Sequence, residues 1–404
     1  MVRLFRKVVV FVKAKGFICL TSQFFFLVLS YALSVIAFPF FLILRLKILP
    51  VTYSAIGHLA VEPDIFLKQG FLGLRPIVRA ILLAPANTAN RHLLKYWRRY
   101  LLVIDHAWIV SLLTPLGRVR FVTYSVYQSC TAINQKAAFP EVQKQWGSRP
   151  PLLTLNDLDL KRGRAFLKSL GISDGAWFVC VHGRDDGDET SQRLHAVRNV
   201  DIFNYIPAMQ EIVGRGGWVF RMGDKIMKPL PSMKNVIDYA HLNYKAEWMD
   251  VFLCGSCRFF LGSSSGLIAV ANIFGVRGVL ANAAAPFSIC FPYGSSDVGI
   301  PKLLWSIKEQ RYLTFKEIFS SPLANLRTSE DFISYNVKAI ENSPDEIRDA
   351  ALEMLDSLEG RLKYTKADQD RQDRMKALMN DTHYSFGAVS RVGKDFLRKY
   401  EYLL

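Results

Sequence analysis

The sequence predicts an α/β protein with two Rossmann-like lobes, preceded by an N-terminal hydrophobic membrane helix. Three observations support this class. The chain has 404 residues, of which 50% are hydrophobic, so it can bury substantial cores. A long uncharged run lies near its N-terminus, and after Pro50 short apolar runs alternate with amphipathic stretches. We expect a membrane anchor over 1–49, a first lobe over 50–147, a second lobe over 148–330 and a C-terminal helical region over 331–404 that packs on the lobes.

The anchor rests on the segment from Gly16 to Leu44, which holds 29 residues without a formal charge. One helix of this length would measure about 43 Å and could cross a hydrocarbon core of about 30 Å. Pro39 interrupts its hydrogen bonding, and basic residues flank both ends, so a bent helix lying in one leaflet remains an alternative to a single span. A cleaved signal peptide is disfavoured because no small-residue cleavage pattern follows.

The charge of the chain is concentrated near this segment. The net charge is +16, and residues 1–150 contain 19 Lys and Arg against 4 Asp and Glu. A basic half attracts anionic surfaces, and each basic group near a charged bilayer contributes about 1 kcal/mol. Because the excess surrounds a membrane segment and no nucleic-acid motif is present, we expect an anionic membrane surface as partner and no nucleic acid. The sequence leaves the oligomeric state open.

The first lobe is expected to repeat strand and helix units. Apolar runs bounded by turn residues are typical of buried parallel strands. The expected elements are strands at 51–53, 80–83 and 101–104, a helix through 64–67 and a helix over 90–100.

The second lobe begins after a linker at 145–151, where adjacent prolines end the periodic pattern. Its alternation is that of a doubly wound sheet. Ser343, Pro344 and Glu346 then form a capping-box signature for a helix in the tail. The expected elements of the lobe are helices at 157–170, 202–213, 248–253 and 266–274, and strands at 177–181, 218–222, 235–238, 258–261 and 278–281.

A serine-rich turn is the first candidate site. Ser263, Ser264 and Ser265 lie between an expected buried strand and a helix that begins at Gly266. Exposed amides and hydroxyls at a helix N-terminus bind phosphate well. The alternative is that the serines only cap the helix, as serine does in many proteins. Their place at the carboxyl end of a strand favours phosphate binding.

A set of polar residues follows two neighbouring expected strands. Arg184 comes after the strand at 177–181 and is followed by Arg198 and Asn199, while Arg221 and Asp224 end the strand at 218–222. The carboxyl ends of parallel strands meet at one edge, and arginines there suit bidentate contacts to phosphate. The alternative for each arginine is a surface ion pair with a nearby aspartate.

His58 and Glu62 are the candidate general bases, because they follow the first expected strand of the first lobe. The alternative is that both only favour the helix end. We assign no metal site. Asp186 and Asp188 offer paired carboxylates near the expected site, but such spacing is common, so a divalent metal is not favoured. Cys254 and Cys257 lack a second pair at zinc spacing and are interpreted as buried thiols.

Several of these segments resemble a family of bacterial glycosyltransferases, with similarity to the wider fucosyltransferase-like and heptosyltransferase-like two-lobe (GT-B-like) enzymes. The resemblance covers about residues 50–320. It departs at His182-Gly183-Arg184, where a histidine, valine, arginine order is expected. The matching blocks are Ile56-Gly57-His58-Leu59, Val181-His182-Gly183-Arg184-Asp185, Arg198-Asn199-Val200-Asp201, Arg221-Met222-Gly223-Asp224, Phe260-Leu261-Gly262-Ser263-Ser264-Ser265-Gly266-Leu267 and Ile300-Pro301-Lys302.

The resemblance implies a nucleotide-sugar donor in the second lobe and a glycan or glycolipid acceptor at the first. It also implies a role in surface polysaccharide assembly, with no cofactor required. Scattered cysteines indicate a reducing compartment, so we expect the lobes on the cytoplasmic side of the inner membrane. The rival hypothesis is a noncatalytic membrane adaptor with the same fold that only binds a glycolipid.

Overall fold

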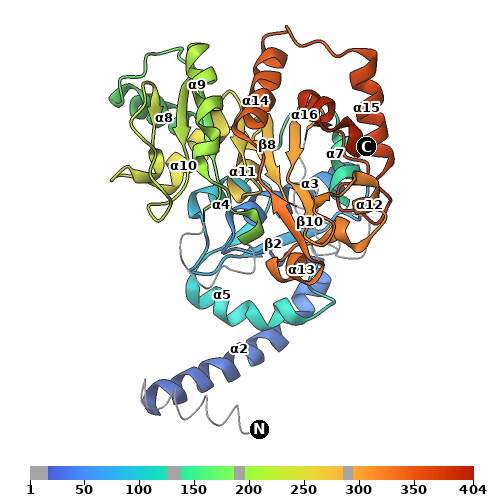
Figure 1. The fold of residues 1–404 in the computed structure, drawn as a ribbon. Coiled ribbons are helices and arrows are strands. Elements are labelled where there is room, and N and C mark those ends of the chain that lie inside the picture. Colours follow the sequence, from blue (N-terminus) through green and yellow to red (C-terminus); the bar gives the residue numbers. More distant parts are fainter. Residues whose placement is uncertain (1–16, 125–137, 186–195, 285–293) are drawn as a thin grey trace.

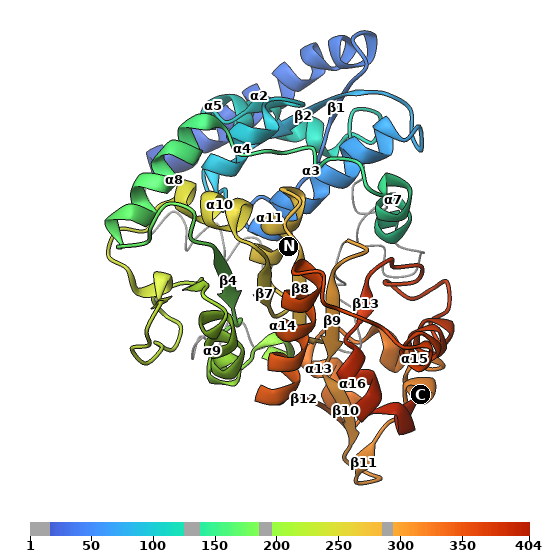
Figure 2. The same cartoon turned by 90° about the horizontal axis from the view of Figure 1, so that it is seen from above.

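The structure is a computed structural model that describes residues 17–124, 138–185, 196–284 and 294–404. These residues form two parallel sheets covered by helices and one small antiparallel sheet. Figures 1 and 2 show the smaller parallel sheet between the N-terminal helices and the larger lobe. The predicted α/β class with parallel sheets is therefore confirmed.

The first lobe is built on three parallel strands in the order β1-β2-β3, and the isolated bridge from Ile48 to Thr123 extends its edge. The strand expected at 51–53 does not form. Its place is taken by β1, which begins three residues after the last residue of α2. The bounds are β1 (Leu46–Ile48), β2 (Arg79–Leu83) and β3 (Leu102–Ile104).

Helices cover both faces of this sheet. A small cluster of buried residues that includes Phe41 of α2, Ile81 of β2 and Val110 of α5 fills the outer face. The inner face belongs to the main core, where Leu59, Leu93 and Trp97 are buried. The bounds are α2 (Phe17–Ile43), α3 (Ile56–Phe71), α4 (Arg91–Trp97), α5 (Ala107–Leu113) and the 3-10 helix η1 (Thr114–Arg118).

The second lobe contains a seven-stranded parallel sheet in the order β13-β9-β8-β7-β4-β5-β6. The order runs outward in both directions from β4 and β7, as in doubly wound sheets. The last strand, β13, comes from the tail, so residues 331–404 contribute a strand to this sheet as well as helices. The bounds are β4 (Phe178–His182), β5 (Trp218–Arg221), β6 (Val236–Ile237), β7 (Phe260–Gly262), β8 (Gly278–Ala283), β9 (Val298–Pro301) and β13 (Arg391–Val392).

The helices of the second lobe pack in pairs. α9 packs on α14, α10 on α11, and α11 on α3 of the first lobe. The predicted capping box of α14 is present, with Ser343 Oγ accepting from Glu346 N and Glu346 accepting from Ser343 N. The bounds are α7 (Ala138–Trp146), α8 (Asp157–Ser169), η3 (Ile202–Tyr205), α9 (Ile206–Gly214), η4 (Tyr239–His241), α10 (Glu247–Ser256), α11 (Gly266–Ile273), α14 (Pro344–Leu358), α15 (Lys366–Ala377), α16 (Lys394–Lys399) and η6 (Glu401–Leu403).

The antiparallel sheet has the order β11-β10-β12 and follows β9 along the chain. Polar contacts also join the two lobes: His92 of α4 lies 2.6 Å from the Asp159 carboxylate of α8, and Glu247 of α10 accepts from the first amides of α4. The remaining bounds are β10 (Leu303–Ser306), β11 (Arg311–Tyr312), β12 (Val337–Ile340), α12 (Phe315–Phe319), α13 (Ser329–Ser334) and η5 (Pro322–Asn325).

Candidate functional site

The strand order creates a switch point between β4 and β7. The chain passes from β4 to β5 and β6 on one side, then returns to β7 on the other side of β4. The two strands pair in parallel, with His182 opposite Gly262 at their carboxyl ends. Loops that leave such a point in opposite directions provide the usual ligand site of doubly wound sheets.

The serine turn lies at this switch point and is locked to β4. Ser263 N donates to the His182 carbonyl (3.0 Å), and Ser263 Oγ accepts from Arg184 N (2.9 Å). Ser263 therefore holds the two loops together. Its hydroxyl accepts in this contact and still has its own proton to donate, so its role as a phosphate ligand stays a prediction.

The next two serines are differently placed. Ser264 is 2% exposed, and neither its Oγ nor that of Ser265 has a hydrogen-bond partner among the described residues. Ser265 occupies the N-cap position of α11 but makes no side-chain cap bond there. The hydrogen bond that the alternative of a capping serine requires is therefore absent at Ser265. Two buried hydroxyls and the first amides of α11 remain available to an anion at this point.

The first helix of the other lobe begins directly against this turn. A Cβ atom on Gly57 would lie 2.7 Å from Gly266 Cα, and one on Gly266 would lie 2.7 Å from Gly57 N. Both distances are too short for carbon, so each glycine is required for α3 and α11 to meet. The space beside the Gly266 Cα atom therefore holds the backbone of Gly57.

This contact can be tested by adding one methyl group. We expect Gly57→Ala to lower the free energy of unfolding by about 1–3 kcal/mol, because the two helices must move apart. Gly214→Ala is the matched control, since a Cβ on Gly214 would meet nothing within 4 Å. Chemical unfolding of both variants in detergent measures the difference, and equal stability of the two would refute the close contact.

His58 and Glu62 form a pair on the first turns of α3. His58 Nδ1 lies 2.7 Å from Glu62 Oε1, and Glu62 Oε2 accepts from Thr52 N at 3.1 Å. The Glu62 side chain is 3% exposed, whereas that of His58 is 41% exposed. Because a carboxylate only accepts, the neutral imidazole carries its proton on Nδ1 and presents the Nε2 lone pair on the exposed side.

His182 belongs to the segment Val181-His182-Gly183-Arg184-Asp185 that resembles the glycosyltransferases, but it had no predicted role. Its side chain is 5% exposed, and Nδ1 has no hydrogen-bond partner among the described residues. Burial, reinforced by the Arg221 and Arg184 charges, lowers its pKa from 6.5 to about 3. The ring therefore stays neutral and offers an unused polar atom at the switch point. The sequence feature that could have identified His182 is its position at the end of an apolar run that forms a buried strand.

The depressed pKa of His182 has a measurable consequence for stability. Between about pH 6.5 and 3 the unfolded chain binds a proton that the folded chain does not, so the free energy of unfolding falls as the pH falls. From pH 7 to 5 this group alone accounts for roughly 2 kcal/mol. We expect His182→Gln to lose less stability than the wild type over that interval in urea unfolding. Equal losses would contradict the buried, neutral state.

The chain that leaves β4 at Arg184 comes back to this residue at Val200. Val200 N donates to the Arg184 carbonyl (2.9 Å), which places Arg198 and Asn199 near Arg184 as predicted. Asn199 O accepts from Lys302 Nζ at 2.8 Å. Lys302 is 3% exposed, and burial lowers its pKa to about 8. Lys302 thus fixes the loop, a contact that the sequence pattern did not identify.

Arg221 and Asp224 lie beside the carboxyl end of β4: Arg221 is opposite Val181 in the sheet, and both charges act on His182. Arg221 is fully buried and donates to Asp238 Oδ1 (3.1 Å) and to the Lys228 carbonyl (2.8 Å). Asp224 is largely exposed and pairs with Lys245 at 3.1 Å. Both have partners inside the lobe, so we treat Arg221 as a residue that positions the loop after β5 and lowers the pKa of His182.

The remaining metal and thiol predictions have different outcomes. Cys254 and Cys257 are buried free thiols, as interpreted from the sequence. Asp186 and Asp188 lie outside the described residues. Within the described ranges no group of three or more His, Cys, Asp or Glu side chains is arranged to hold a metal ion.

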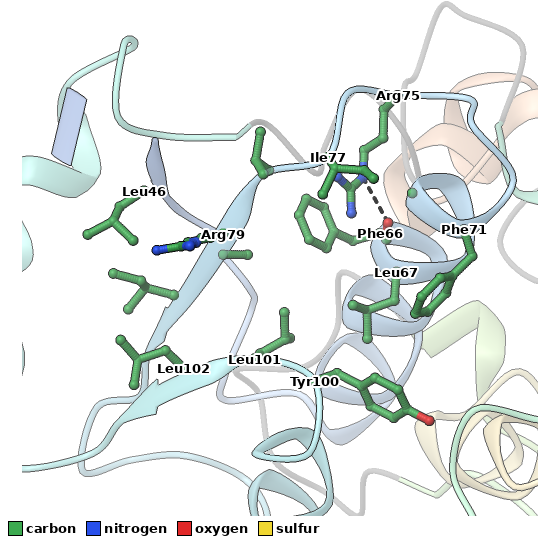
Figure 3. Close-up of a pocket in the computed structure, with 14 residues that line it drawn as sticks. Leu46, Phe66, Leu67, Phe71, Arg75, Ile77, Arg79, Tyr100, Leu101 and Leu102 are labelled. Carbon is green, nitrogen blue, oxygen red and sulfur yellow. Dashed lines mark hydrogen bonds between the residues drawn. The ribbon is translucent and has the colours of Figure 1, made fainter. Parts of the chain in front are cut away.

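A cavity of about 540 Å³ lies at the other end of the first sheet. Arg79 and Leu102, the first residues of β2 and β3, contribute to its wall, so it opens at the amino ends of the strands. Figure 3 shows Arg75 in this cavity, where Nε donates to the Phe66 carbonyl at 2.9 Å. Because the serine turn meets α3 at its opposite end, this cavity is not part of the switch-point site.

Comparison with known proteins gives structural likeness only. No family model and no curated protein matches the chain. A glycosyl transferase family 9 structure from Veillonella parvula DSM 2008 is similar at 11% identity and a TM-score of 0.42, covering 72% of this chain and 95% of its own. E. coli ADP-heptose lps heptosyltransferase II gives 10% identity, a TM-score of 0.42 and coverages of 64% and 90%.

A third similar structure is E. coli heptosyltransferase WaaC with ADP, at 10% identity, a TM-score of 0.33 and coverages of 64% and 91%. All three TM-scores lie below 0.5.

Proposed function

We propose that this chain is a glycosyltransferase that moves a sugar from a nucleoside-diphosphate sugar to a hydroxyl of a glycan or glycolipid acceptor beside a membrane. The single observation that carries the proposal is the contact between Gly57 and Gly266. His58, which has a buried carboxylate partner, follows Gly57 in the chain, and Gly266 follows the serine turn with its buried, unpartnered hydroxyls, so the contact supports a base beside an anion site. A base and an anion site are the two parts that glycosyl transfer needs.

In the proposed reaction, His58 Nε2 takes the proton of the acceptor hydroxyl while that oxygen attacks the anomeric carbon. The bond from this carbon to the diphosphate oxygen breaks, and the nucleoside diphosphate leaves with the bonding electrons. Glu62 stabilises the imidazolium that forms, as the carboxylate of a catalytic triad does.

The leaving diphosphate gains negative charge on the oxygen that was bonded to the anomeric carbon. The α11 amides, the hydroxyls of Ser264 and Ser265 and the Arg184 guanidinium are proposed to bind it. Arg198 and Asn199 approach from the same loop. With these groups the transfer requires no metal, and we propose a cytoplasmic location of the lobes, where nucleotide sugars are made, in surface polysaccharide assembly.

The proposal can be tested with a panel of sugar nucleotides. A ligand that binds only the folded state raises the melting temperature, by an amount equivalent to about 2.7 kcal/mol at one hundred times its Kd. We expect one nucleoside-diphosphate sugar to stabilise the protein in detergent, and the matching nucleoside, which lacks phosphate, to do so far less. No stabilisation by any member of a panel that covers the common bases and sugars would refute the donor site.

A further inference from the structure

Half of the N-terminal helix is part of the first lobe. Ser30 and Ser34 of α2 are buried, and Ser34 Oγ donates to the Leu112 carbonyl of α5 at 3.4 Å. Phe41, two turns later, is buried in the outer core of the first sheet. Figures 1 and 2 show α2 running obliquely across the outer side of this lobe with α5 beside it. α2 therefore has one side bound to protein along its second half.

This packing limits how α2 can meet a bilayer. The uncharged portion before the contact, from Gly16 to Leu29, follows Lys15 and would be about 21 Å long as a helix, which is shorter than a hydrocarbon core of about 30 Å. An upright α2 could span a membrane only by drawing α5 into it. Since α5 is fixed to the sheet through Val110, the lobe would have to enter as well.

The free side of both helices is apolar. α5 and η1 lie in a run from Ala107 to Gly117 that contains no formal charge. Trp108 of α5 is 61% exposed, and no other described segment covers it. The exposed apolar side chains of α2 are Phe25, Phe26, Leu27, Val28, Leu29, Tyr31, Val35, Ile36, Phe40, Leu42 and Ile43.

Basic residues border this apolar surface. Arg45 and Lys47 follow α2, while Arg118 and Arg120 follow α5. Arg118 NH1 donates to Tyr31 OH of α2 at 3.3 Å, so the basic residues that follow α5 are held against α2. Apolar side chains with cations at their margin match the boundary between acyl chains and anionic headgroups.

We propose that α2 and α5 together form an in-plane membrane platform that inserts into one leaflet of an anionic bilayer, with both ends of α2 on the side of the lobes. The positive flanks of α2 agree with this arrangement, because basic segments on both sides of an apolar helix are then retained on the same side. The inference rests on the proposed membrane attachment and is independent of glycosyl transfer. It adds α5 as a second membrane contact.

The topology is tested on the full chain with an N-terminal tag. The protein is synthesised in the presence of sealed vesicles of equal parts phosphatidylcholine and phosphatidylglycerol that contain a protein-insertion machinery, so that either topology can form, and a protease is then added. We expect the tag and the C-terminus to be cleaved equally, as they are in vesicles lysed with detergent. A tag that is protected until lysis, with an accessible C-terminus, would establish a span and overturn the in-plane platform.

The contribution of α5 is tested by Trp108→Glu in vesicle flotation. Loss of a buried aromatic contact should weaken vesicle binding about tenfold or more. Tyr402→Glu is the matched control, because Tyr402 is an aromatic residue of similar exposure (67%) near the C-terminus, far from α2 in both views. Circular dichroism checks that both variants fold.

Each result of the flotation experiment has one interpretation. Unchanged binding by folded Trp108→Glu would remove α5 from the membrane contact and refute the platform. Absence of binding by the wild type would refute membrane attachment as a whole, while transfer to a water-soluble acceptor would still support the proposed reaction.

Discussion

Replacement of His58 by alanine should lower kcat by about 10²–10⁴-fold while donor affinity stays within about twofold of the wild type. The reason is geometric. The His58 side chain is 41% exposed and Glu62 lies 2.7 Å from its Nδ1, which leaves Nε2 to take a proton in the transition state. It makes no required contact with the diphosphate. Steady-state rates together with calorimetric titration of the donor separate the two effects.

Glu62→Gln serves as the companion variant. An amide can donate to Nδ1 as well as accept, so it no longer fixes the tautomer, and an uncharged partner does not stabilise the imidazolium. We expect a large loss of kcat, with donor binding retained. Wild-type rates in His58→Ala, in protein with an unchanged melting temperature, would remove the base from the first lobe and require another proton acceptor.

The second large effect is expected at Arg184. Its main chain is fixed at the switch point through Ser263, and its charge acts on His182. A charged hydrogen bond contributes about 1.5–3 kcal/mol, so Arg184→Ala should weaken nucleoside-diphosphate binding by roughly ten- to a hundredfold. Arg184→Lys should recover only part of this affinity, because lysine keeps the charge but loses the planar fork. Calorimetry with the nucleoside diphosphate measures each Kd.

Arg361→Ala is the charge-matched control for this series, because Arg361 is 59% exposed and pairs with Glu359 at the end of α14, outside the switch point. It removes the same charge from the same protein. If Arg184→Ala and Arg361→Ala bound the nucleoside diphosphate with equal affinity, then Arg184 would contribute only to the general field, and the anion site would have to lie elsewhere.

The edge of the main sheet could be predicted from the sequence because parallel strands impose a simple rule. Arg184 and Ser264 follow strands that the apolar runs identify, and the carboxyl ends of those strands meet. Arg221 ends β5 at the same edge, but the partners of its side chain could not be predicted in this way. Its side chain projects from a face of the sheet, where Asp238 accepts from it, and the sequence does not contain that tertiary contact.

The first strand of the first lobe could not be predicted from the sequence pattern either. β1 has only three residues, of which Ile48 alone is buried, so no alternation marks it beside the long apolar helix. Val51 is buried too, but by packing in the core and without strand pairing. The i, i+4 spacing of His58 and Glu62 puts them on one helix face only because α3 begins at Ile56, earlier than the helix expected through 64–67. Which of the two is exposed depends on packing against Thr52, which only the fold determines.

The most direct test of the account is donor-dependent transfer. The full-length wild type and His58→Ala are incubated with the sugar nucleotide that stabilises the protein and with a total glycolipid fraction, and release of the nucleoside diphosphate is followed together with sugar incorporated into lipid. We predict equal release and incorporation by the wild type, and a rate about 10²–10⁴-fold lower for His58→Ala. Tight donor binding by the wild type with neither release nor incorporation would contradict the account and favour a noncatalytic glycolipid-binding protein with this fold.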